Sequence, residues 1–222
     1  MTHYARVTRS LLVTTLLLTP AAARGQMIAH KQDPETYAAT RGRALSQYAL
    51  DAWDDRHGLP QNSVQAIAQT TDGYLWLGTQ DGIVRFDGVR FTVFGRDASP
   101  ALRRPYIWAL EAARDGGLWI GTEEAGLIYA SNGKYTSYTT SNGLPSNWIS
   151  TIYEAANGQL WIGTRDSGVA RMANGLVERI AVPGRSVNSI TEDATGAIYV
   201  ATGKGVTRID ASGRQSAVAP EL

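Results

Sequence analysis

The chain of 222 residues contains no cysteine. Disulfide bonds, thiol catalysis and cysteine-ligated metal sites are therefore excluded. Histidine is almost as scarce, because two of the three histidines lie within the first 30 residues and only His57 lies further along the chain. No Ser–His–Asp order and no convergent set of metal ligands emerges. We therefore expect no catalytic residues, no metal site and no cofactor.

An excess of charge of either sign is also missing. Twenty-one Lys and Arg stand against 20 Asp and Glu, which gives a formal net charge of +1. Lysine is rare, and the arginines are scattered without a basic run. Nucleic-acid-binding domains usually concentrate positive charge on one face. We therefore expect no nucleic-acid partner.

No apolar run is long enough to span a membrane. The longest, LLVTTLLLT at 11–19, is about nine residues, whereas a spanning helix needs roughly 20. Arg6 and Arg9 precede this run, and the small residues of PAAARG follow it. This order is typical of an export signal. We predict a signal peptide over residues 1–25, cleaved after Ala23 or Gly25, and a periplasmic or secreted protein without a membrane span; an uncleaved membrane anchor is the alternative.

One motif dominates the rest of the chain. It reads DGYLWLGTQDG from residue 72, GGLWIGTEEAG from 116, GQLWIGTRDSG from 158 and, in a degenerate form, GAIYVATGKG from 196. The aligned aromatic residues Trp76, Trp119, Trp161 and Tyr199 follow one another at 43, 42 and 38 residues. A period near 40 is typical of propeller blades and of helical repeats.

The interior of the repeat favours blades. Strand-like segments such as SVQAIAQT and WISTIYEA precede the motif, and turn pairs such as Asp72-Gly73 and Asn157-Gly158 separate the apolar runs. Such pairs are the strongest short-range hairpin signal. Each repeat therefore encodes four short antiparallel strands. We predict an all-β protein, a β-propeller-type array of about four four-stranded blades over residues 62–95, 105–140, 147–182 and 187–219.

Both faces of the motif strand carry apolar side chains. In a strand, Tyr74 and Trp76 point to one face, and Leu75 and Leu77 point to the other. Both faces are covered when blades pack face to face around an axis. The motif tryptophans then supply buried area between blades, and glycines such as Gly78 leave room for the adjacent sheet or a bend. The Trp motif is thus expected in the core.

These segments resemble the two-component regulator propeller repeat. GLPQNSVQAIAQTTDGYLWLGTQDGIVRFDGVRFTVF (58–94) is similar to a first blade of that family, and SNGLPSNWISTIYEAANGQLWIGTRDSGVAR (141–171) to an internal one. The resemblance covers residues 48 to about 213 and implies the periplasmic sensor region of bacterial hybrid histidine kinases or diguanylate cyclases. Such receptors carry many more blades, a membrane helix and output domains. No kinase signature is present here, so we expect a short or truncated member without its own output domain.

The ring is expected to be incomplete. YALDAWDDRHGLP from Tyr48 aligns with YTSYTTSNGLP from Tyr135, so residues 48–54 read as an outermost strand without a blade of its own. A closing strand of this kind completes the last blade of a closed propeller. Four blades lie at the lower end of the range that propellers use. We predict a polar leader at 26–47 and an open partial propeller at 48–222 that self-associates through its uncovered blade faces.

One end of the array gathers the candidate ligand-binding side chains. The loops that lead into the innermost strands and the loops that follow the motif share that end of a propeller. Aromatic rings beside amides and charged groups can stack on and hydrogen-bond a polar ligand such as a glycan. The alternative is that these residues build turns and pack blades. The candidates are Asn62, Gln80, Asp81, Tyr106, Trp108, Glu123, Asn147, Trp148, Arg165, Asp166, Asn188 and Lys204.

Two classes of function follow from this layout. The first is a non-enzymatic extracytoplasmic module that senses or binds a small polar ligand. The second is a secreted propeller enzyme, such as a lyase or a glycosidase. A glycosidase needs two carboxylates across a cleft, but neighbours on a strand such as Asp54 and Asp55 point to opposite faces. We therefore favour the binding module.

Overall fold

The computed structural model describes residues 51–95, 98–102 and 106–218. The expected signal peptide and leader lie outside the described residues, as do residues 48–50 of the expected closing strand. The described part is all-β, with 16 strands and short 3₁₀ helices at Asp55–His57, Pro100–Leu102 and Thr140–Asn142. The sequence prediction of an all-β fold is confirmed.

The strands form four separate sheets of four antiparallel strands in chain order. Each sheet corresponds to one repeat, and we number the sheets as blades 1 to 4. Blade 1 contains β1 (Val64–Gln69), β2 (Leu75–Thr79), β3 (Gly82–Phe86) and β4 (Phe91–Phe94), and blade 2 contains β5 (Ile107–Ala112), β6 (Leu118–Thr122), β7 (Leu127–Ser131) and β8 (Lys134–Tyr138). Blade 3 contains β9 (Ile149–Glu154), β10 (Leu160–Thr164), β11 (Val169–Ala173) and β12 (Leu176–Ile180), and blade 4 contains β13 (Val187–Glu192), β14 (Ile198–Thr202), β15 (Gly205–Ile209) and β16 (Gln215–Val218).

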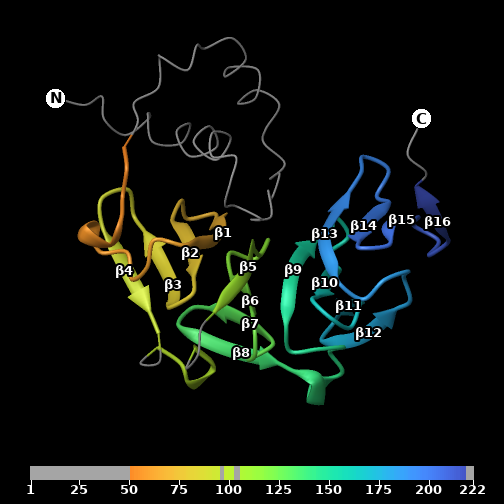
Figure 1. Cartoon of the computed structure of the whole chain (residues 1–222), viewed down its shortest axis with the longest axis horizontal. Coiled ribbons are helices and arrows are strands. Elements are labelled where there is room, and N and C mark those ends of the chain that lie inside the picture. The colour runs from red at the N-terminus through yellow and green to blue at the C-terminus, as the bar shows by residue number, and fades with distance from the viewer. Residues whose placement is uncertain (1–50, 96–97, 103–105, 219–222) are drawn as a thin grey trace, which may run out of the picture.

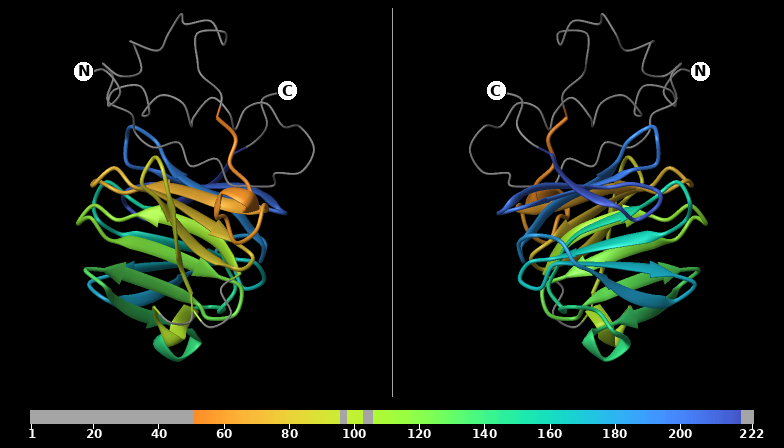
Figure 2. Two further views of the ribbon diagram at one scale, coloured as in Figure 1. Left: turned by 90° about the vertical axis from the view of Figure 1, so that its left-hand side faces the viewer. Right: turned by 90° about the vertical axis from the view of Figure 1, so that its right-hand side faces the viewer.

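The blades stand side by side in an arc (Figure 1), with blade 1 at one end and blade 4 at the other. The first strand of each blade lies innermost, because β1 packs beside β5, β5 beside β9 and β9 beside β13. The side views show the blades as twisted sheets stacked along the arc (Figure 2). The described sheets do not close into a ring, as the sequence predicted.

The turns between strands take the form that the sequence pairs indicate. At Asn132-Gly133 the two residues have φ values of 50° and 73°, and at Asn174-Gly175 they have 51° and 77°. Two consecutive positive φ angles suit the right-handed twist of a tight hairpin. Asparagine followed by glycine meets this need because both residues tolerate the left-handed region.

The core lies between the blades. We call the face of each sheet that carries the motif aromatic residue the aromatic face, and the other the aliphatic face. Between blades 1 and 2, Trp76, Ile83 and Phe94 of the aromatic face pack against Ile120 and its neighbours on the aliphatic face. The same two faces meet between blades 2 and 3 and between blades 3 and 4. The prediction that the Trp motif packs between blades agrees with these clusters.

The segment expected to close the ring has a different arrangement. Residues 51–54 form no strand, and Trp53 packs edge-on against Phe86 of blade 1, with 5.0 Å between ring centroids. Blade 4 has its own outer strand, because β16 pairs with β15 from Val206↔Val218 to Ile209↔Gln215. The segment Gln215–Val218 therefore completes the fourth sheet, as the predicted four-stranded blade over 187–219 requires.

Candidate ligand-binding site

Strand register brings two sets of loops together at one end of the arc. The first residue of each inner strand pairs with the last residue of the motif strand, as in Val64↔Thr79 and Ile107↔Thr122. The loops that lead into the inner strands therefore lie beside the loops that follow the motif. We call this end of the arc the mouth face. All twelve candidate residues lie in its loops or at the adjoining strand ends.

The threonine of the GT motif shapes the loop that follows it. Thr79, Thr122 and Thr164 are fully buried, and each donates its hydroxyl to a backbone carbonyl at 2.8–2.9 Å on the far side of the loop. Each hydroxyl also accepts a hydrogen bond from a backbone N–H within the loop. The buried threonine hydroxyl thus satisfies polar backbone groups of the loop. The side chains of the residues that follow the threonine therefore lie on the mouth face.

One group of candidates meets between blades 1 and 2. The Gln80 amide donates to the Tyr106 hydroxyl at 2.9 Å. The Tyr106 and Trp108 rings stack with 5.0 Å between centroids and 11° between planes. Trp108 Nε1 is buried and has no hydrogen-bond partner among the described residues. Two parallel half-buried rings beside an amide form a surface on which a sugar ring or another flat polar ligand can stack.

A bulge aims the indole of Trp108. The register of every inner strand shifts near its start, which leaves Gln65, Trp108, Ser150 and Asn188 unpaired in the ladder. A bulge re-aims one side chain and bends the strand. The four positions are equivalent in the repeat, so each blade presents one such residue. Asn188 is exposed, whereas Trp108 is half-buried.

Two of the candidates have a structural role. Asn62 Oδ1 accepts from the backbone N–H of Asp55 at 2.8 Å, and Asn147 Oδ1 accepts from that of Thr140 at 2.9 Å. Each asparagine thereby satisfies the first turn of a short 3₁₀ helix. Their side-chain oxygens are engaged in the fold, and they do not join the group around Tyr106.

The remaining candidates are spread along the mouth face. Trp148 is half-buried, and its backbone carbonyl accepts from the N–H of Arg165 at 3.0 Å, so these two residues are adjacent on blade 3. Glu123 is similarly fixed by its N–H, which donates to the Tyr106 carbonyl at 3.1 Å. The exposed residues are Asp81, Arg165, Asp166, Asn188 and Lys204.

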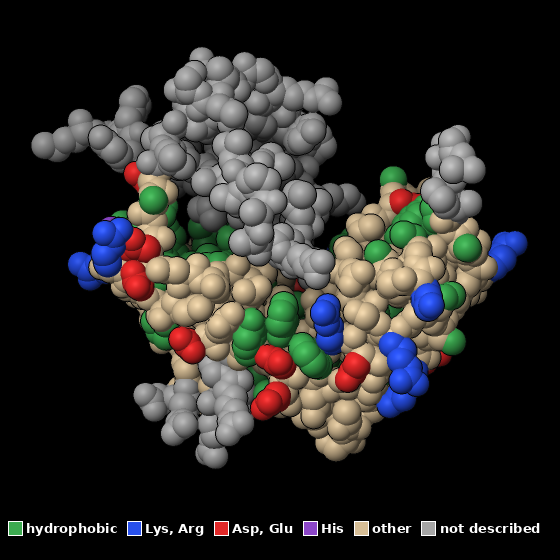
Figure 3. Space-filling model, in the orientation of Figure 1, with side chains coloured by type: hydrophobic (Ala, Val, Ile, Leu, Met, Phe, Trp, Pro, Cys, Tyr) green, Lys and Arg blue, Asp and Glu red, His purple; other side chains and the backbone are tan. Residues whose placement is uncertain are grey.

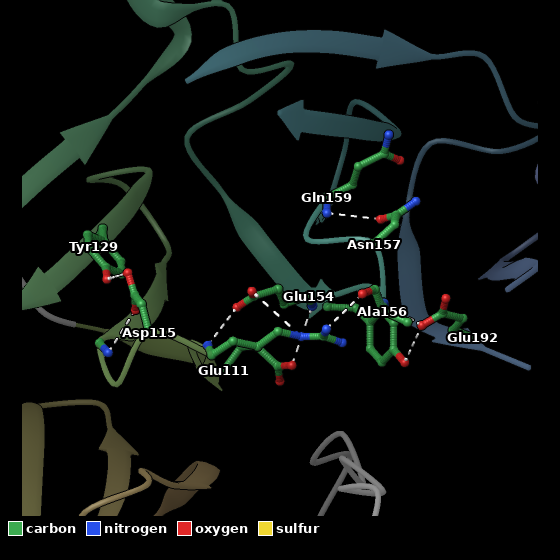
Figure 4. A network of polar contacts seen from close by, with 11 residues as sticks. Glu111, Asp115, Tyr129, Glu154, Ala156, Asn157, Gln159 and Glu192 are labelled. Carbon is green, nitrogen blue, oxygen red and sulfur yellow. Dashed lines mark hydrogen bonds and ion pairs between the residues drawn. The ribbon is translucent and has the colours of Figure 1, made fainter. Parts of the chain in front are cut away.

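A second polar group lies at the opposite end of the inner strands (Figure 4). The Glu154 carboxylate of blade 3 accepts from the backbone N–H of Arg114 of blade 2 at 3.1 Å. One repeat later, Glu192 accepts from the N–H of Ala156 at 2.8 Å. The sequence analysis missed this group, although the recurrence of glutamate at the same repeat position was a signal for it. These hydrogen bonds join blade 2 to blade 3 and blade 3 to blade 4.

Glu111 is the buried member of this group. It is 5% exposed, and burial raises the pKa of its carboxyl group to about 7. One oxygen accepts from the Glu154 N–H at 3.4 Å, and the other has no partner among the described residues. A carboxyl group in this setting favours the neutral form at mildly acidic pH.

The described residues include one histidine and no group of side chains that could hold a metal ion. His57 lies beside Asp54, with 2.8 Å between Nδ1 and Oδ1, where both cap a 3₁₀ helix. Within the described ranges, no three His, Asp or Glu side chains could hold a metal ion together.

No helix in the described part of the chain has the length and apolar character needed to cross a membrane. Both signs of charge occur across the face drawn in Figure 3.

The sheets and their interfaces define a protein of β-propeller blades arranged as an open arc. Three segments of the sequence match the two component regulator propeller family, at residues 58–81, 101–124 and 143–166. The chain therefore carries three recognised repeats of that family. No curated protein matches it at a significant level.

Solved structures share the fold. The extracellular domain of a one-component system of B. thetaiotaomicron has a TM-score of 0.62 at 20% identity, covering 74% of this chain and 25% of that one. The extracellular domain of a hybrid two-component system of the same organism has a TM-score of 0.52 at 23% identity, covering 75% and 31%. Virginiamycin B lyase of Staphylococcus aureus has a TM-score of 0.60 at 17% identity, covering 74% and 58%. The chain thus spans less than a third of the length of the two extracellular domains.

Proposed function

We propose that the protein is an extracytoplasmic ligand-sensing module of a bacterial two-component-type signalling system. Three matched repeats of the regulator propeller family support the signalling context. Similarity in fold to the extracellular domains of a two-component and a one-component system supports the extracytoplasmic location. Signal output would belong to another domain or to a partner protein.

The mouth-face group of Gln80, Tyr106 and Trp108 is the observation that supports ligand binding. It offers two stacked rings and an amide that is already oriented. The proposed ligand is accordingly small and polar, with a flat face that can stack on the rings, and a glycan has these properties.

An enzymatic role receives less support. The lyase and a gluconolactonase of Xanthomonas campestris share the fold at 17% and 13% identity, a level that speaks only for architecture. The one histidine in the described part of the chain caps a helix, and no metal cluster accompanies it. We therefore propose binding without turnover.

Calorimetry with a panel of neutral and acidic oligosaccharides tests the proposal. Gln80→Ala, in the group between blades 1 and 2, and Arg165→Ala, on the mouth face of blade 3, should each weaken binding by about tenfold or more while the melting temperature stays unchanged, because both side chains are exposed. Arg179→Ala is a matched control, because Arg179 is exposed on the outer strand of the same blade. Wild-type affinity in both mouth variants would remove them from the site, and the absence of binding to the whole panel would contradict the glycan class.

A further inference from the structure

The loops that follow the motif change in charge along the arc. The two positions after the GT motif read QD at 80–81, EE at 123–124 and RD at 165–166, and after the AT of blade 4 they read GK at 203–204. Their formal charge is therefore negative in blades 1 and 2, zero in blade 3 and positive in blade 4. These loops thus turn from acidic to basic along the mouth face.

The loop that leads into blade 4 adds a further cation. Arg185 stands two residues before the inner strand, at the position that Asn62 and Asn147 occupy before blades 1 and 3. Those two asparagines cap 3₁₀ helices, but no 3₁₀ helix directly precedes blade 4 in the described part of the chain. Arg185 therefore has no capping role, and its side chain is exposed.

Hydrogen bonds and close packing place three cations on adjoining loops. The Gly168 N–H, at the end of the loop that carries Arg165, donates to the Arg185 carbonyl at 2.7 Å. On the other side of the same entry loop, a Cβ atom at Gly184 would lie 3.3 Å from Lys204 Cγ. The entry loop of blade 4 thus lies between the loop with Arg165 and the loop with Lys204. We call Arg165, Arg185 and Lys204 the cationic patch.

The cationic patch has no counterion among the described residues. Four arginines elsewhere each form an ion pair with a carboxylate, namely Arg56, Arg114, Arg171 and Arg214. The three cations of the patch are exposed, and none of them pairs with a described carboxylate, although Asp166 follows Arg165 directly. Positive charges that gather without counterions raise the local concentration of anions.

We propose that the cationic patch is the anionic subsite of the ligand-binding face, and that the ligand is an acidic oligosaccharide whose carboxylate or sulfate group lies on the patch. This inference rests on the proposed glycan-binding function and names the class of glycan. One sugar ring of the ligand stacks on Tyr106 and Trp108, and an acidic unit further along the chain reaches blades 3 and 4.

The chemistry of the patch suits both acidic groups. A guanidinium group can donate two parallel hydrogen bonds to two oxygens of a carboxylate or a sulfate, and a lysine ammonium adds a point charge. The half-buried Trp148 lies on blade 3, and its carbonyl accepts from the Arg165 N–H at 3.0 Å. An oligosaccharide that runs along the arc can therefore contact the rings of blade 2, this tryptophan and the patch in turn.

Calorimetry with paired oligosaccharides tests the proposal. The probes are oligosaccharides of uronic acids and of sulfated sugars, each measured beside its carboxyl-reduced or desulfated counterpart. At least one acidic probe should bind the wild type about tenfold tighter than its neutral counterpart in about 20 mM salt. This preference should shrink in about 500 mM salt, because salt screens exposed charges.

Variants of the patch locate the source of this preference. Arg185→Gln and Lys204→Gln should each reduce the affinity for the acidic probe about threefold, and the double variant about tenfold, while the affinity for the neutral counterpart stays unchanged. Lys134→Gln is the matched control, because Lys134 is exposed and begins β8 at the end of blade 2 opposite to the mouth face. It removes the same charge from the chain as Lys204→Gln, so it should keep the wild-type preference.

The outcomes separate this inference from the binding function on which it rests. Equal affinity of the wild type for acidic and neutral counterparts would overturn the anionic subsite and leave glycan binding in place, and this comparison requires no variant. A wild-type preference in the double variant, or an equal loss of preference in Lys134→Gln, would also overturn the subsite. The absence of binding to every probe would contradict both the subsite and the glycan class.

Discussion

At the scale of single residues, the glycine, the leucine and the asparagine of the GLP-x-N segment each have a role in the fold. Gly58 and Gly143 end a short 3₁₀ helix with φ values of 103° and 96°, which glycine adopts without strain. The leucine that follows is buried, at 7% exposure for Leu59 and 0% for Leu144. The asparagine three residues after the leucine returns to the start of the helix. These three residues together hold the loop that leads into the inner strand in one conformation.

Replacing the motif glycine by alanine should destabilise a blade interface. In Gly163→Ala, the new methyl group would lie 2.3 Å from Thr151 Cγ2 and 2.7 Å from Val187 Cγ1, and both of these residues are fully buried. Overpacking of this kind costs about 1–3 kcal/mol. Chemical denaturation should show that loss. Gly203→Ala is the matched control, because nothing lies within 4 Å of a Cβ there, and equal stability in the two variants would contradict the close contact.

Truncating the motif aromatic residue should cost more. Trp119 packs on the interface between blades 2 and 3, with its ring centroid 4.4 Å from that of Tyr129 and 6.1 Å from that of Tyr138. Trp119→Ala should lose about 3–5 kcal/mol of a stability that is typically about 5–15 kcal/mol. Thermal unfolding followed by circular dichroism measures the loss. An unchanged melting temperature would show that the ring contributes nothing to the interface.

At the scale of strands and turns, local sequence determines most of what is observed. The predicted blade limits of 62–95 and 105–140 contain strands that begin at Val64 and Ile107 and end at Phe94 and Tyr138. Hairpin turns need particular residue types at fixed places, so they are visible in the sequence. The bulge at Trp108 was not visible, because register depends on the partner strand and no residue type is specific for it.

Contacts between repeats were harder to foresee than contacts within them. The sequence indicates Asn62 and Trp108 equally as candidates on one face. In the structure, Asn62 caps a 3₁₀ helix, whereas Trp108 stacks on Tyr106. The difference comes from which loop lies within reach, and that depends on the packing of two blades. The link from Glu154 to the Arg114 N–H spans two repeats for the same reason. A candidate site that spans two blades therefore needs the fold before its members can be assigned.

The interface between blades 2 and 3 should lose stability as the pH rises. Burial holds the pKa of Glu111 at about 7 in the folded state, above the usual unfolded value near 4.3. The folded state thus binds more protons between these values, so this contribution is complete below about pH 4 and is lost as the pH rises through 7. Its size is at most about 4 kcal/mol. The pKa of Asp193 is lowered to about 2, so the protonation of this carboxyl group affects the stability only at pH values below about 4.

Glu111→Gln should remove most of this dependence. The amide oxygen can still accept from the Glu154 N–H, and no charge has to be buried at high pH. The melting temperature of the variant should exceed that of the wild type at pH 8, and the difference should shrink towards pH 5. An equal difference in melting temperature between variant and wild type at the two pH values would contradict a buried ionisable carboxyl group at this position.

At the scale of the whole molecule, the proposed extracytoplasmic role requires that the protein is exported. The segment LLVTTLLLT between two arginines and PAAARG predicts cleavage of a signal peptide. Mass spectrometry of protein recovered from the periplasm of an expressing bacterium should find a new N-terminus at Arg24 or Gln26. An intact Met1 in the membrane fraction would show that the segment anchors the protein instead.

The order of the blades should set their protection against hydrogen exchange. In a linear array, each repeat is stabilised by its own strands and by its neighbours. The inner strands β5 and β9 each lie between two other inner strands, whereas β1 and β13 have one neighbour each among the described strands. Amides of β5 and β9 should therefore exchange at least about tenfold more slowly than those of β1 and β13, which corresponds to about 1.4 kcal/mol in the free energy of local opening. Equal protection of all four inner strands in dilute solution would show that the ends of the arc are already covered in the monomer.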